Sequence, residues 1–109
     1  MDASEVESIV REEIGDQWFR TNLHHVDLAR CVVFPPRKIR CRNTFPHHDR
    51  PKPRYLDLWL VLEEEPGSSD GYLIVFDDSR RVFGLADWGD DRAVFWGFHG
   101  TFLDTLDGM

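Results

Sequence analysis

The second half of the chain contains four short apolar runs separated by turn sequences, and this pattern constrains the fold most. The runs cover residues 55–62, 72–76, 81–88 and 93–98. The segments between them are rich in Gly, Asp, Ser and Pro, which favour turns. Strands of this length with such connections predict an antiparallel meander. Six side chains of these runs should be mostly buried: Leu58, Leu60, Leu62, Ile74, Phe76 and Phe95.

Both ends of the chain have the pattern of amphipathic helices. In residues 4–19 the apolar side chains recur at helical spacing, and Ser4-x-x-Glu7 has the form of a capping box. We expect this helix to end near residues 18–20. At the other end, Thr101 can cap a short helix that Gly108 terminates, and so short a helix forms only when it docks.

The segment between the first helix and the meander is less regular. Residues 20–31 fit either a loop with one helical turn or the approach to a strand, and residues 31–34 are β-rich. The two prolines at 35–36 then forbid regular ladder pairing. Residues 38–45 alternate with period two and have a mostly basic outer face, whereas the prolines of residues 46–53 indicate a loop.

Together these elements predict an α+β fold in one domain over residues 1–109: an N-terminal helix, a four- to six-stranded mostly antiparallel meander sheet, and a short C-terminal helix docked on the sheet. The helices should cover one sheet face. Four Trp, two Tyr and eight Phe can fill a compact core, and two Cys are too few for a disulfide scaffold. No apolar run approaches the roughly 18–20 residues of a membrane span. The acidic start lacks the features of a signal peptide, so we expect a soluble, cytoplasmic protein without membrane contact.

Charge is unevenly distributed along the chain. Residues 30–54 contain eight basic residues and one acidic residue, whereas the other 84 residues contain five basic and nineteen acidic ones. The net charge of −7 is therefore the difference between a basic segment and an acidic body. If the basic segment is not folded against the acids, the molecule has two electrostatically different sides.

The basic segment is a candidate binding surface for an anion. Its candidate side chains are Arg37, Lys38, Arg40, Arg42, Arg50, Lys52 and Arg54. Nucleic acid is disfavoured as a partner, because the acidic body repels a long polyanion and no nucleic-acid-binding motif accompanies the bases. Two interpretations of the basic segment stay open: neighbouring acids such as Asp57 and residues 63–65 neutralise its bases, or it binds an acidic protein. Of the two partner types, we favour a cationic protein at the acidic body.

Histidines and cysteines recur between residues 24 and 48, in the order His24, His25, Cys31, Cys41, His47 and His48. These donor types suit zinc, which needs four converging N or S ligands. Their spacing differs from the close Cys pairs of structural zinc sites, so we expect no metal and no cofactor, with both cysteines buried as small apolar side chains. A zinc-binding domain through these residues stays as an alternative.

Three other polar residues are candidates for catalysis. His99 lies between Gly97 and Gly100 in the sequence. Asp57 lies within an apolar strand, and Asp87 precedes a Trp. None belongs to a recognisable catalytic motif, so we assign no catalytic residue. A small hydrolase that uses His99 or Asp57 in a cleft is the enzymatic alternative.

Aromatic residues concentrate in the last half of the chain. Most should be buried, but a single sheet with two small helices can leave one face incompletely covered. Exposed aromatic side chains would then mark a partner surface, and Trp88 is the candidate that we name for it.

Four stretches of the chain, Leu58–Glu64, Gly71–Asp77, Phe83–Ala86 and Gly97–Leu103, resemble small uncharacterised bacterial single-domain proteins. Those proteins have this order of strands and a similar closing segment. The resemblance covers residues 20–109 and implies no activity and no site residue. Small acidic bacterial domains of this sort are often immunity proteins of toxin systems, which is an analogy of size and charge.

We therefore expect a non-enzymatic, acidic protein-binding module, with an immunity-type inhibitor that acts by occlusion as its most specific form. Its acidic face would match a basic cleft on a cationic partner protein and speed association. A few aromatic side chains would supply the affinity. The sequence carries no signal for the oligomeric state.

Overall fold

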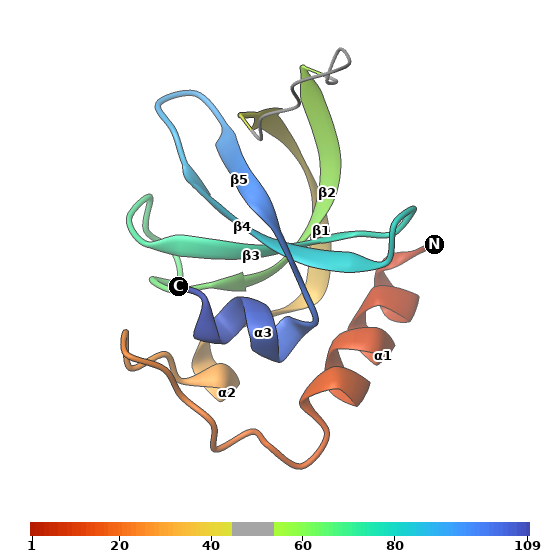
Figure 1. Cartoon of the computed structure of the whole chain (residues 1–109), viewed down its shortest axis with the longest axis vertical. Helices are drawn as coiled ribbons and strands as arrows, with labels where there is room; N and C mark the ends of the chain where they lie inside the picture. Colours follow the sequence, from red (N-terminus) through yellow and green to blue (C-terminus); the bar gives the residue numbers. More distant parts are fainter. Residues whose placement is uncertain (45–53) are drawn as a thin grey trace.

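The computed structural model describes residues 1–44 and 54–109 and has an α+β fold (Figure 1). Its elements in chain order are α1 (Ala3–Ile14), α2 (Leu28–Cys31), β1 (Val32–Asn43), β2 (Tyr55–Glu63), β3 (Tyr72–Asp77), β4 (Val82–Trp88), β5 (Ala93–Gly100) and α3 (Phe102–Asp107). The predicted N-terminal helix, antiparallel meander and short C-terminal helix are confirmed. Within residues 1–44 and 54–109, no helix combines the length and apolar character needed to cross a membrane.

The meander closes into a barrel, which the sequence did not predict. Consecutive strands pair antiparallel, and β1 then pairs with β5 in parallel through Cys41–Ala93, Arg42–Val94 and Asn43–Phe95. Close packing of β4 on β5 helps the wall to bend. A Cβ atom on Gly84 would lie only 2.4 Å from the carbonyl oxygen of Gly97. Glycine is therefore required at this close approach of two strands.

Both sides of the barrel wall are buried, which explains the nearly continuous apolar strands. Leu60 and Val75 pack with Phe95 in the cluster that fills the barrel. Their neighbours Val61 and Phe76 belong to a second cluster, which lies between the outside of the wall and the helices. Alternate residues of a strand point to opposite faces, so both sets must be apolar. The six side chains predicted to be buried are each at most 1% exposed.

The N-cap of the first helix lies two residues before the predicted N-cap. Asp2 is the N-cap, and its carboxylate accepts a hydrogen bond from the backbone N–H of Glu5 at 2.9 Å. The Glu5 carboxylate accepts from the Asp2 N–H in return, which completes a capping box. The capping box predicted at Ser4 and Glu7 is therefore wrong, although its form and approximate position are right.

The first helix also ends earlier than predicted, at Ile14 instead of near residues 18–20. Gly15 has φ of +58°, a conformation that glycine adopts readily, and its N–H bonds to the Arg11 carbonyl. The chain then runs as a loop to Asp27, whose side chain caps the single turn of α2. Of the two alternatives for residues 20–31, the loop with one helical turn is the correct one.

The two predicted strand pieces around the proline pair form one strand, β1. Pairing with β2 joins Val32 to Leu62 and resumes only at Arg37 opposite Leu60. The interrupted ladder at Pro35 and Pro36 is thus confirmed, since proline lacks the N–H that a ladder needs. The division into two strands is wrong, because the extended backbone continues through the interruption.

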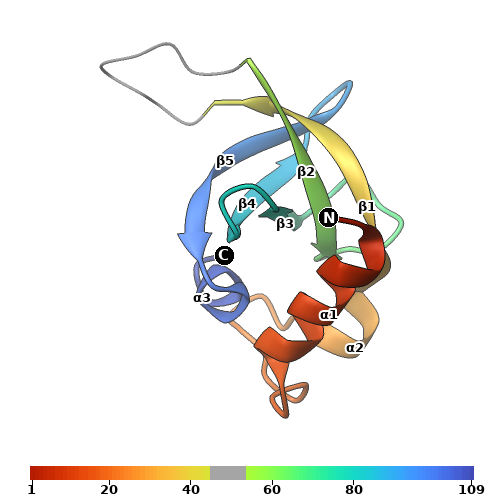
Figure 2. The ribbon, with the colours of Figure 1, turned by 90° about the vertical axis from the view of Figure 1, so that its right-hand side faces the viewer.

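The helices lie together at one end of the barrel, as Figure 2 shows for α1 and α3. Thr101 caps α3 as predicted, by accepting a hydrogen bond from the Asp104 N–H at 3.1 Å. The Phe102 N–H at the start of α3 donates to the Glu13 carboxylate of α1 at 2.9 Å. This contact joins the two helices and sets the position of the cavity between them.

Candidate functional site

The basic side chains of β1 are largely neutralised by acids on neighbouring elements. The ion pairs are Arg37–Glu63 at 3.5 Å, Lys38–Asp78 at 3.3 Å and Arg40–Asp57 at 3.0 Å. The hydrogen bond from Arg40 holds the pKa of the Asp57 carboxyl below its ordinary range. All three cations remain substantially exposed, so each pair adds little to the stability of the fold. Their main effect is to reduce the positive potential of this strand.

The other basic candidates have different surroundings. Arg42 and Arg54 are exposed, and neither has an ion-pair partner among residues 1–44 and 54–109. Arg50 and Lys52 lie outside the described residues. Trp88 is half-buried, packs against the cluster inside the barrel, and lines a cavity of about 300 Å³ beside Arg92.

The candidate zinc ligands that the structure describes do not lie together. Cys31 belongs to the cluster under the helices, whereas Cys41 lies inside the barrel. Both thiols are buried, and burial raises the pKa of Cys41 to about 12. His24 pairs with Glu64 at 2.9 Å. His47 and His48 lie outside the described residues, and within residues 1–44 and 54–109 no three metal-ligating side chains are grouped to hold an ion.

The two candidates for hydrolysis are on separate surfaces. Asp57 is on the outside of β2, where Arg40 donates two hydrogen bonds to its carboxylate at 3.0 and 3.3 Å. His99 is exposed at the end of β5 and lies against Gly108, after the last helix. Asp87 is half-buried and borders a third, smaller cavity with Tyr72. Neither His99 nor Asp57 is among the residues that line the three cavities described for residues 1–44 and 54–109.

The end of the molecule that carries the helices has an excess of acidic residues. Residues 1–31 and 101–109 contain nine acidic and three basic residues, a net charge of −6. We call this part of the molecule the helical end. Two of its three bases are already paired, Arg11 with Glu7 and Arg20 with Asp107. The helical end is therefore one acidic part of the molecule, and residues 55–100, with ten acidic and three basic residues, are another.

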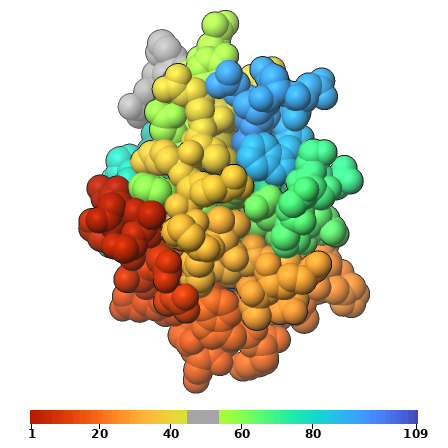
Figure 3. Space-filling model, turned by 180° about the vertical axis from the view of Figure 1, so that it is seen from behind, coloured from red at the N-terminus to blue at the C-terminus, as the bar shows by residue number. Residues whose placement is uncertain are grey.

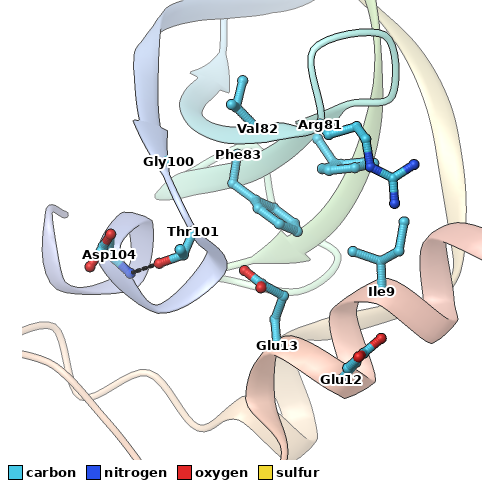
Figure 4. Close-up of a pocket in the computed structure, with 10 residues that line it drawn as sticks. Ile9, Glu12, Glu13, Arg81, Val82, Phe83, Gly100, Thr101 and Asp104 are labelled. Carbon is cyan, nitrogen blue, oxygen red and sulfur yellow. Dashed lines mark hydrogen bonds between the residues drawn. The ribbon is translucent and has the colours of Figure 1, made fainter.

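A cavity of about 430 Å³ opens between α1, the β3–β4 turn and α3 (Figure 4). Its apolar lining is formed by Ile9, Phe76, Val82 and Phe83. Carboxylates border it, from Glu12 and Glu13 on α1 and from Asp104 on α3, together with the guanidinium group of Arg81. We call this cavity the acidic groove. Its chemistry suits the aliphatic stem and charged head of a basic side chain.

The loop between α1 and α2, residues 15–27, presents two large apolar side chains to solvent. Phe19 is 84% exposed and Leu23 is 93% exposed. We call these two residues the apolar pair. They are the most exposed of the large hydrophobic side chains in the part of the chain that the structure describes. Large exposed apolar side chains are one feature of contact sites for other molecules.

Hydrogen bonds hold this loop in one conformation. Asn22 donates from its side-chain amide to the Leu106 carbonyl at 2.8 Å and accepts from the Val26 N–H at 3.3 Å. The Thr21 hydroxyl donates to the Val26 carbonyl at 2.9 Å. Arg20 bonds to Asp107 of α3 at 2.6 Å. The apolar pair is therefore displayed on a backbone fixed to the last helix.

The sequence did not predict the apolar pair, because its apolar pattern indicated a first helix that continues to residues 18–20. In a helix, Phe19 would follow Trp18 by about 100° and would not share the buried face. Leu23 stands alone in a polar stretch, which is the usual context of an unremarkable surface residue. The one available signal was Gly15, a helix terminator placed before both residues.

No protein-family model, curated protein or solved structure matches this chain. Its function is therefore inferred from its own surfaces.

Proposed function

We propose that this protein is a protein-binding module that docks through its helical end onto a cationic partner protein. The observation that carries the proposal is the apolar pair, displayed on a loop that is tied to α3. Exposed apolar side chains of this size, held on fixed backbone, have the character of interface anchors. The partner would be of the class expected from the sequence, and the immunity-type inhibitor is its most specific form.

The energetics of burial favour a contact centred on the apolar pair. Complete burial of a Phe or Leu side chain contributes about 1.5–3 kcal/mol. Binding usually also costs free energy to order a loop, but the hydrogen bonds of Asn22 and Thr21 already restrict this one. More of the burial energy is then available for affinity.

The charge around the apolar pair selects the kind of partner. A net charge of −6 at the helical end favours a basic surface and speeds its diffusional encounter. It opposes a second copy of the chain, whose helical end is equally acidic. It also opposes insertion of the loop into a membrane with anionic headgroups. A protein with an apolar pocket and a basic rim fits both features.

Occlusion is the mechanism that this geometry supports. The 15–27 loop is at the extreme of the molecule opposite the β4–β5 turn (Figure 1), so it can enter a cleft before the rest of the surface makes contact. A basic side chain of the partner can then enter the acidic groove, with its stem along Ile9 and Phe83. Such a complex blocks a cleft without any chemical step by this protein.

The test begins with the identity of a partner and ends with a measured affinity. Photo-crosslinkers placed at positions 17 and 24 would flank the apolar pair, and mass spectrometry would identify the crosslinked protein. The purified partner is then titrated with wild-type protein and with the double variant Phe19→Ser, Leu23→Ser. We expect a basic protein whose affinity falls by about 100-fold in the double variant, because two anchors are lost.

The matched control is Trp96→Ser, which removes an exposed aromatic side chain from the barrel and should leave this affinity unchanged. Light scattering with chromatography gives the oligomeric state of the same variants. A dimer that the double variant converts to monomer would overturn the proposal, since the apolar pair would then be a contact between copies. Equal losses of affinity in the double variant and in Trp96→Ser would also contradict it.

A further inference from the structure

The outer face of the barrel carries a cluster of guanidinium groups around Tyr55. Arg42 of β1 is directly opposite Tyr55 of β2 and directly beside Val94 of β5. The guanidinium carbon of Arg92 lies 4.9 Å from the centre of the Tyr55 ring, and that of Arg40 lies 6.0 Å from it. Figure 3 shows this face, with β1 in yellow beside β5 and its preceding turn in blue.

Two of these three cations are available to a ligand. Arg40 is engaged in two hydrogen bonds with Asp57. Arg42 is exposed and has no acidic partner within ion-pair distance among residues 1–44 and 54–109. The Nε atom of Arg92 is buried and has no hydrogen-bond partner among those residues, and it lies 3.8 Å from the carboxylate of the exposed Asp91. A buried donor without an acceptor is costly, and an incoming oxyanion can satisfy it.

An exposed aromatic ring lies beside this cluster. Trp96 is 53% exposed and follows Val94 by two residues on β5. Since Val94 is level with Arg42, strand spacing and rise per residue place the α-carbons of Arg42 and Trp96 roughly 8 Å apart. That separation is comparable to the distance between base and phosphate within one nucleotide.

We propose that this outer face binds a nucleotide unit, with the phosphate at Arg42 and Arg92 and the base stacked on Trp96. A guanidinium group offers paired donors that match phosphate oxygens, and an indole face stacks with any base. Tyr55 acts as a positioning residue, because the Arg92 guanidinium lies over its ring and Arg42 is its partner in the strand ladder. The site is on the barrel wall and is independent of the protein-binding surface at the helical end.

The net charge of −7 does not exclude a ligand of this size. The helical end holds nine of the acidic residues, and salt screens charges beyond a Debye length of about 8 Å at physiological ionic strength. Asp57 is near the site and is neutralised by Arg40. Glu63, Asp90 and Asp91 line the cavity beside Arg92 and reduce its positive potential. A free nucleotide and one unit of a short single strand share the same chemistry, so the experiment must separate them.

The experiment titrates the protein with four probes: inorganic phosphate, adenosine, adenosine monophosphate and a ten-nucleotide single strand of thymidine. NMR shifts of the Trp96 indole N–H and the Arg42 Nε–H report binding. We expect adenosine monophosphate to bind at least tenfold more tightly than phosphate or adenosine, because it uses both halves of the site. Tighter binding of the oligonucleotide than of the monophosphate would identify a single strand as the ligand, and the reverse order would identify a free nucleotide.

Variants assign the two halves of the site. Arg42→Gln should weaken phosphate and monophosphate binding about tenfold, whereas Trp96→Leu should weaken monophosphate binding and leave phosphate binding unchanged. Arg30→Gln is the matched control, since it removes one exposed positive charge from α2. Circular dichroism confirms folding. Equal effects of Arg30→Gln and Arg42→Gln, or binding of none of the four probes, would overturn the proposal.

Discussion

Arg20 in the 15–27 loop donates a hydrogen bond to the carboxylate of Asp107 at 2.6 Å and thereby joins the loop to the last helix. The side-chain amide of Asn22 adds a second connection, to the Leu106 carbonyl. These contacts link segments more than 80 residues apart in the chain. The short C-terminal helix therefore supports the loop that displays Phe19 and Leu23.

Removal of the Asn22 side chain should loosen the loop and leave the barrel intact. Asn22→Ala deletes a donor to Leu106 and an acceptor for the Val26 N–H, so we expect a loss of about 1 kcal/mol in local stability. Hydrogen exchange measured by NMR should show faster exchange at the Val26 amide. Glu7→Ala, which breaks the exposed pair with Arg11 on α1, is the control and should not change that rate. An unchanged Val26 rate in Asn22→Ala would show that other contacts hold the loop.

Both sides of the barrel wall should be equally essential to stability. Leu60→Ala empties a site inside the barrel, and Phe76→Ala empties one between wall and helices. We expect unfolding free energies to fall by about 2–5 and 3–5 kcal/mol respectively, measured by urea denaturation. Leu23→Ala makes the same chemical change at a side chain that is 93% exposed, and should alter stability by less than about 0.5 kcal/mol. A small effect of Phe76→Ala alone would mean that the helices dock weakly.

The Asp78 carboxyl should titrate below its ordinary pKa of 3.8, chiefly because the Trp59 indole N–H donates to it at 3.0 Å and also because Lys38 lies beside it. A carboxyl with a lowered folded-state pKa stabilises the fold above its unfolded pKa, and this contribution is lost as the pH falls through the folded value. Trp59→Phe should raise the pKa of Asp78, as followed by carboxyl NMR. The pKa of Asp57, which Arg40 lowers, is the internal control and should not move. A constant Asp78 titration in Trp59→Phe would assign the shift to Lys38.

Cys41 should resist alkylation as long as the barrel is closed. Its side chain is buried, and burial raises its pKa to about 12, so almost no thiolate is present at pH 8. Mass spectrometry after iodoacetamide treatment should find Cys41 unmodified in native protein and fully modified in urea. Cys31, whose pKa burial also raises, should behave alike. Rapid labelling of Cys41 under native conditions would show that the β1–β5 pairing opens.

The candidate surfaces were only partly foreseeable from the sequence. The charge asymmetry was evident from the sequence. The pairing of basic β1 side chains with Asp57 and Glu63 was one of two interpretations that the sequence left open. The location of the acidic face was not foreseeable, because it depends on α1 and α3 lying side by side. The cluster of Arg42, Arg92 and Tyr55 was also not foreseeable, since it joins β1, β2 and the turn before β5 through two long-range pairings.

Features that depend on neighbouring residues could be predicted from the sequence. Glycine and aspartate turns separate the strands, a two-residue period marks the outer face of β1, and Thr101 caps the last helix because its hydroxyl reaches an N–H three residues on. The tertiary structure alone decided the parallel pairing of Cys41 with Ala93 that closes the barrel. It also decided the exposure of Phe19 and Leu23. Barrel closure requires accumulated twist over five strands, and exposure depends on what other segments cover, so neither leaves a local pattern in the chain.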